Sequence, residues 1–209
     1  SDALRANLRE TAVEPITIDP RHEPLRDVVS NYAGILKNLD RLLRELNHPF
    51  RNWKLILPEL RGFVLKNCSR FVRSPNGAQC FLLFSDFFLG ALSEVRTETD
   101  VRAILEGLTA YLEKQAQLLK GKQLAEFSPA FDTVFYALSQ LSDEKLLLLS
   151  QTHHPVKRTV TLIMNKVQRE NRPFPLSARI VQLLAIRSLQ ATYDYWLRQA
   201  DPEWYTVLG

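Results

Sequence analysis

The clearest pattern in the chain is a regular recurrence of apolar residues between Pro24 and Asn47. Apolar side chains follow one another at spacings of three and four residues, at Leu25, Val28, Tyr32, Ile35, Leu39, Leu42 and Leu46. Val29, Leu36 and Leu43 widen this band by one position per heptad. The spacing predicts a long amphipathic helix whose apolar face is too wide for a two-stranded coiled coil, so it has to pack against other helices.

Further helical patterns follow, separated by short polar or proline-containing breaks. They predict helices over residues 52–72, 78–92, 97–119, 128–141, 142–152, 155–167 and 177–199. Pro58 predicts a kink or a new start inside the first of these helices. Ser128 and Pro129 predict an N-terminal cap followed by a first-turn proline. In the last helix the strongly polar residues share one stripe, which predicts a central position in the fold.

Strand patterns are almost absent, since only the brief run Ile16–Ile18 is β-branched. Residues 1–23 predict a short helix followed by an extended, proline-containing linker, and residues 24–209 predict a single all-helical domain. We therefore expect an all-α fold with about eight helices, arranged as an antiparallel helical bundle or a short α-solenoid.

Composition places the chain among ordinary globular proteins, with 45% apolar and 24% charged residues. Cys68 lies on the apolar face of its predicted helix, and we interpret it as a small buried side chain rather than as half of a disulfide with Cys80. The first ten residues do not resemble a signal peptide, and the most apolar window, residues 81–89, is too short to span a bilayer. These features predict a cytoplasmic protein without a membrane partner.

No set of residues has the spacing of a catalytic or metal site. His153 and His154 are adjacent but lack further ligands at metal-binding spacing, and Asp143 and Glu144 fit a helix start, where acids complement the helix dipole. Phosphate-binding glycine loops and nucleophile-elbow motifs are also missing. We expect no catalytic activity, no cofactor and no bound metal.

Basic residues dominate one stretch, since every charged residue between positions 150 and 190 except Glu170 is Lys or Arg. The candidate members of a partner-binding or anion-binding surface are Lys157, Arg158, Lys166, Arg169, Arg172 and Arg179. A solvated helix face is the ordinary explanation of such a run. The functional alternative is a surface for an acidic partner domain or for nucleic acid.

Two stretches carry a resemblance to a known family. Residues 52–67 read NWKLILPELRGFVLKN, and residues 188–204 read SLQATYDYWLRQADPEW. They resemble the helical region that precedes the catalytic domains in large bacterial relatives of phosphoenolpyruvate synthase and pyruvate phosphate dikinase. The resemblance implies a parent protein that moves phosphate between ATP, a histidine and pyruvate. The nucleotide-binding glycine loops, the phosphorylated histidine segment and the magnesium-binding barrel have no counterpart here, so this chain would be an accessory helical domain.

The sequence therefore predicts a non-catalytic helical interaction or regulatory domain, part of a larger phosphotransfer protein, that docks a neighbouring domain or a protein partner. Two alternatives stay open. One is a nucleic-acid-binding helical domain that uses its basic faces. The other is a small-molecule sensor with a pocket lined by aromatic residues, for which the candidates are Trp53, Phe81, Phe84, Phe87, Phe88, Phe131 and Phe135.

Overall fold

A computed structural model of the chain describes residues 53–151, 155–173 and 175–200. These residues contain seven helices and no strand: α4 (Trp53–Arg73), α5 (Gly77–Glu94), α6 (Glu98–Leu118), α7 (Gln123–Ser139), α8 (Asp143–Gln151), α9 (Pro155–Arg169) and α10 (Ala178–Ala200). Each matches a helix predicted from the sequence, so the all-helical fold is confirmed for this part of the chain. The predicted segments 1–23 and 24–47, His153, His154 and the aromatic residues after position 200 lie outside the described residues.

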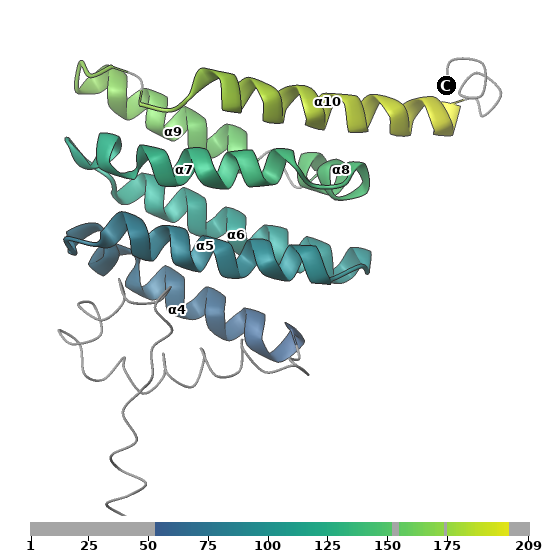
Figure 1. The fold of residues 1–209 in the computed structure, drawn as a ribbon, viewed down its shortest axis with the longest axis horizontal. Helices are drawn as coiled ribbons and strands as arrows, with labels where there is room; N and C mark the ends of the chain where they lie inside the picture. Colours follow the sequence, from purple (N-terminus) through teal and green to yellow (C-terminus); the bar gives the residue numbers. More distant parts are fainter. Residues whose placement is uncertain (1–52, 152–154, 174, 201–209) are drawn as a thin grey trace, which may run out of the picture.

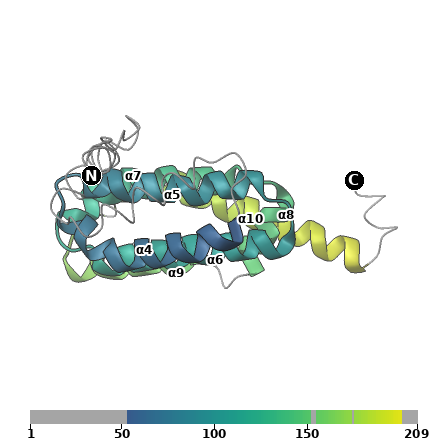
Figure 2. The same cartoon turned by 90° about the horizontal axis from the view of Figure 1, so that it is seen from below.

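The helices form two layers, and successive long helices alternate between them (Figure 1 and Figure 2). In one layer α6 lies between α4 and α9, and in the other α7 lies between α5 and α10. Contacts of α5 with α4 and α6 join the layers, while the short α8 packs against α10 and α6. Because each helix packs mainly on near neighbours, α4 and α10 stand at opposite ends of the stack.

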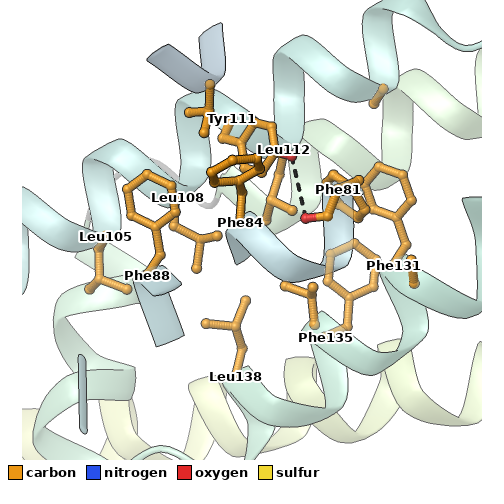
Figure 3. Packing of buried hydrophobic residues seen from close by; sticks show 14 of the residues in the cluster. Phe81, Phe84, Phe88, Leu105, Leu108, Tyr111, Leu112, Phe131, Phe135 and Leu138 are labelled. Atoms are coloured by element: carbon orange, nitrogen blue, oxygen red, sulfur yellow. Dashed lines mark hydrogen bonds between the residues drawn. The ribbon is translucent and has the colours of Figure 1, made fainter. Parts of the chain in front are cut away.

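Aromatic side chains fill the space between the layers (Figure 3). The ring centroid of Phe81 lies 4.6 Å from that of Phe131 and 5.3 Å from that of Tyr111. The hydroxyl of Tyr111 donates a hydrogen bond of 3.3 Å to the carbonyl oxygen of Phe81. Burial of each such ring stabilises the fold by about 1.5–3 kcal/mol. Five of the rings proposed for a sensor pocket are therefore core side chains: Phe81, Phe84, Phe88, Phe131 and Phe135.

The predicted start of α7 is wrong. We expected Ser128 to cap a helix opening at Pro129, but α7 begins at Gln123 and continues through Pro129. Buried residues at spacings of three and four run through the whole helix, at Leu124, Phe127, Phe131, Val134 and Leu138. Ser128 has another role, because its hydroxyl donates a hydrogen bond to the carbonyl oxygen of Pro175. The sequence alone did not distinguish this contact between distant segments from a local cap.

The predicted helix starts at residues 97 and 142 are each capped by a side-chain hydroxyl. Thr97 precedes α6 with an extended backbone, and its hydroxyl accepts a hydrogen bond of 3.3 Å from the backbone N–H of Asp100. The hydroxyl of Ser142 accepts a longer bond of 3.4 Å from the N–H of Lys145 at the start of α8. A side-chain oxygen in this position satisfies a backbone donor that has no partner inside the helix.

Candidate functional site

Helix α10 lies at the end of the stack, so the predicted central position is wrong (Figure 1). Four large apolar side chains on it are more than half exposed: Ile186 by 54%, Leu189 by 70%, Tyr193 by 60% and Trp196 by 64%. Their spacing of three, four and three residues places them along one face of the helix. This face is the kind of seam that packs against another helix, and among the described residues no helix covers it.

A groove runs beside this seam. Helix α9 packs on α6, whereas α10 packs on α7 and α8. The space between α9 and α10 forms a cavity of about 550 Å³. Its lining comes from the last turn of α8 and from the facing sides of α9 and α10: Leu149, Ser150, Val156, Lys157, Val160, Thr161, Met164, Val181, Leu184, Ala185, Ser188, Leu189 and Thr192. We call this cavity the α9–α10 groove. Leu189 belongs both to the groove and to the exposed seam.

The groove is suited to an apolar occupant. Two of its hydroxyls are already engaged: Ser150 bonds Leu147 O at 2.7 Å, and Thr192 bonds Ser188 O at 2.9 Å. The hydroxyls of Ser150 and Thr192 also lie 3.1 Å apart, which ties α8 to α10. Lys157 is the one charged residue among those that line the groove. An occupant would therefore bury apolar side chains and could place a carboxylate beside Lys157.

The six basic residues proposed from the sequence do not form one surface. Lys157 lines the α9–α10 groove, whereas Arg158 on the same helix faces α6, with its Nε 3.0 Å from the Oε1 of Glu113. The ammonium of Lys166 donates to three carbonyl oxygens around the C-terminal end of α6, those of Ala116 (2.6 Å), Gln117 and Leu119 (2.8 Å). Lys166 therefore stabilises a helix end.

The other three candidates also lie apart from the groove lining. Arg172 forms an ion pair of 3.0 Å with Glu170, whose carboxylate also accepts the N–H of Gly121. Arg169 and Arg179 are exposed near opposite sides of the loop that joins α9 to α10. Three of the six basic groups, those of Arg158, Lys166 and Arg172, thus have ion-pair or carbonyl partners in the fold, and the predicted partner-binding or anion-binding surface stays a prediction. The nucleic-acid alternative stays a prediction.

A second concave region carries charges of both signs. Arg61, Arg102, Arg158, Glu106 and Glu113 line a cavity of about 410 Å³ formed by α4, α6, α8 and α9, together with Thr109, Ala110 and Gln151. Arg102 bonds the carboxylate of Glu98 and the amide oxygen of Gln151. The Oε1 of Glu113 is within ion-pair distance of Arg158 but lacks a well-directed hydrogen bond. This mixture of neighbouring acids and bases favours an internal ion-pair network over an anion site.

The thiols and acids offer no alternative centre. Cys68 and Cys80 are fully buried and are not joined by a disulfide. Burial raises the pKa of the Cys68 thiol to about 12, so this thiol stays protonated at neutral pH. Within the described ranges no group of three or more His, Cys, Asp and Glu side chains could hold a metal ion. None of the helices described is both long enough and apolar enough to cross a membrane.

Comparisons with models of protein families, with curated proteins and with solved structures give no match to this chain. The resemblance to the accessory region of phosphoenolpyruvate synthase-like proteins therefore stays a prediction. The groove and the seam were missed at the sequence level. The sequence does carry a signal for them, the spacing of Ile186, Leu189, Tyr193 and Trp196. The same spacing is expected of a helix buried inside the fold, which is why it predicted a central position for α10.

Proposed function

We propose that this chain is a non-catalytic helical interaction domain that docks an amphipathic helix of a partner protein against the α9–α10 face. The observation that carries the proposal is the exposed seam of α10 beside an apolar groove. Elsewhere in the described stack, long helices bury such faces against a neighbour in the same layer. A partner helix would continue the stack by the same packing, with apolar residues at every third and fourth position. In this view the architecture is a short α-solenoid, open at α10.

The charge of the groove indicates which charged side chain the partner helix should carry. Because Lys157 is the one charged residue lining the groove, the partner helix should carry an Asp or Glu beside its apolar stripe. Such a pair at a partly exposed rim adds mainly specificity and association rate, while the apolar contacts of Leu189 and Met164 supply most of the affinity. Within a larger phosphotransfer protein of the predicted kind, the partner helix would belong to a neighbouring domain.

The test compares two matched substitutions. Leu189→Glu places a charge in the α10 seam, and Leu55→Glu places the same charge on α4, where the side chain is equally exposed (70% for Leu189 and 71% for Leu55). We expect a protein captured by the wild type and by Leu55→Glu to be lost with Leu189→Glu. A helical peptide from that protein should then bind the purified domain at least about tenfold more weakly after Leu189→Glu, the effect of losing about 1.4 kcal/mol.

Charge reversal provides an independent control. Lys157→Glu should weaken the same peptide, and a matching Glu→Lys or Asp→Lys change in the peptide should restore binding. Lys66→Glu, on the exposed side of α4, should leave binding unchanged. Equal binding by the wild type and Leu189→Glu would contradict the proposed docking face.

A further inference from the structure

We infer that the exposed seam of α10, formed by Ile186, Leu189, Tyr193 and Trp196, pairs with the same seam of a second copy of this chain. The inference goes beyond the proposed function, because one helix in the α9–α10 groove cannot cover both surfaces. At about 3.6 residues per turn, the seam is centred about 90° around α10 from the residues that line the groove. A helix in the groove therefore leaves Ile186 and Tyr193 exposed, and neither of them lines the groove.

The seam is accessible to a second copy. The buried residues of α10, which are Leu184, Ser188 and Ala191, lie on the opposite side of the helix from the seam. Helix α10 also stands at an end of the described stack (Figure 1). A second copy can therefore approach the seam without displacing another of the described helices.

The seam carries no charge that would oppose pairing with itself. Between positions 180 and 193 the single charged residue is Arg187, and its guanidinium lies 3.1 Å from the Oδ1 of Asp143 at the start of α8. In a symmetric interface a charge on the contact surface meets like charge from the other copy, which costs binding free energy. A different protein would find no charge on the seam to pair with, whereas a second copy needs none.

The order of the side chains favours an antiparallel pair. The spacings of three, four and three residues read the same in both directions, so Ile186 of one copy faces Trp196 of the other, and Leu189 faces Tyr193. Each contact then joins an aliphatic side chain to an aromatic ring, which keeps the two helices at an even distance. A parallel pair would instead place Trp196 against Trp196 and leave a gap between the shorter Ile186 side chains.

The available area fits a weak dimer. A fully buried aromatic side chain removes about 150–250 Å² from solvent, and Tyr193 and Trp196 are 60% and 64% exposed. Together with Ile186 and Leu189, these rings would bury about 800 Å² over both copies before flanking residues are included. Specific interfaces below about 1,200 Å² belong mainly to weak complexes. We therefore expect a dimer that forms at micromolar or higher concentrations and leaves α10 free in dilute solution.

Sedimentation equilibrium of the purified chain tests the pairing. We expect the average mass to rise from that of one copy toward that of two as the concentration increases. Tyr193→Glu should weaken dimerisation at least about tenfold, because symmetry brings the new charge into the interface from both copies. Tyr136→Glu on α7 is the matched control, since Tyr136 is 52% exposed and Tyr193 is 60% exposed, and it should leave the dimer unchanged.

Two results of this experiment would overturn the inference. One is the mass of a single copy at every concentration up to about 1 mM. The other is a dimer that survives Tyr193→Glu, because the copies would then meet through another surface.

Cysteine cross-linking tests the antiparallel arrangement. Both native thiols are fully buried, so an introduced surface cysteine is the reactive one. We expect copies with Ile186→Cys to form a disulfide with copies that carry Trp196→Cys. Neither variant should cross-link with itself, because the two positions are ten residues apart, about 15 Å along the helix and beyond the reach of a disulfide. Cross-linking of each variant with itself would indicate parallel pairing and contradict the inference.

These outcomes are separate from those that test the proposed function. Tyr193 does not line the groove, so Tyr193→Glu should disrupt the dimer and leave binding of the partner peptide intact, whereas Leu189→Glu should weaken both. If the chain is monomeric and Leu189→Glu still weakens peptide binding, the dimer is ruled out and the proposed function stands. If the chain dimerises through the seam and Leu189→Glu does not affect peptide binding, the dimer stands and the proposed function fails.

Discussion

At the residue scale, Gln115 places an unpaired amide in the core. The side chain is fully buried on α6, and among the described residues neither its Oε1 nor its Nε2 has a hydrogen-bond partner. An unsatisfied buried polar group costs about 1–3 kcal/mol of folding free energy. Its neighbours on the same face of α6, including Tyr111 and Leu112, are buried.

We therefore expect Gln115→Met to stabilise the fold by about 1–2 kcal/mol, because methionine has a similar length without the polar amide. The measurement is the midpoint of urea unfolding. Gln117→Met on the exposed side of the same helix is the control, and it should change stability by less than about 0.5 kcal/mol. A loss of stability with Gln115→Met alone would show that the amide has a partner in solution, such as a buried water.

At the element scale, the sequence was sufficient wherever a helix was bounded by local chemistry. Thr97 and the acids after it defined the start of α6, and the apolar spacing gave the length of α4 despite Pro58. It was insufficient where a contact between distant segments decided the outcome. Ser128 looked like a cap but bonds Pro175, and the apolar face of α10 looked central but is open. Apolar spacing identifies a face that can be buried, but it does not identify what covers that face.

The end of α6 provides a second prediction at this scale. The last carbonyl groups of a helix have no backbone N–H donor within the helix. At the end of α6 the ammonium of Lys166 donates hydrogen bonds to such carbonyl oxygens. Burial, with Arg169 and Lys120 nearby, lowers the pKa of Lys166, yet the three carbonyl oxygens favour its charged form. We expect Lys166→Met to destabilise the fold by about 1–2 kcal/mol at neutral pH.

Lys157→Met is the matched control. Lys157 lies on the same helix, α9, but it lines the open groove and does not contact the end of α6. Urea unfolding should show little change for this variant. Equal unfolding midpoints for the wild type and Lys166→Met would contradict a structural role of Lys166 and would return it to the candidate binding surface.

At the scale of the whole molecule, stability should vary along the stack. Helix α6 has α4 and α9 on its two sides and also packs against α5 and α8. Helix α10 packs on α7 and α8, and its C-terminal turns project past α8 (Figure 1). When elements contact mainly their near neighbours, terminal elements can open without unfolding the centre. The face proposed for docking would then lie on the most easily opened part of the described stack.

Hydrogen exchange tests this gradient. We expect the amides of α6 to exchange slowest, and those of residues 193–200 to exchange fastest among the helical residues described, because local opening there breaks few buried contacts. Adding the partner helix should slow exchange in α9 and α10 and leave α6 unchanged. Equal protection of α6 and α10 without a partner would instead indicate one cooperative unit. An end helix with the full stability of the core would need a permanent cover over Leu189, Tyr193 and Trp196, which would contradict a groove that opens for a partner.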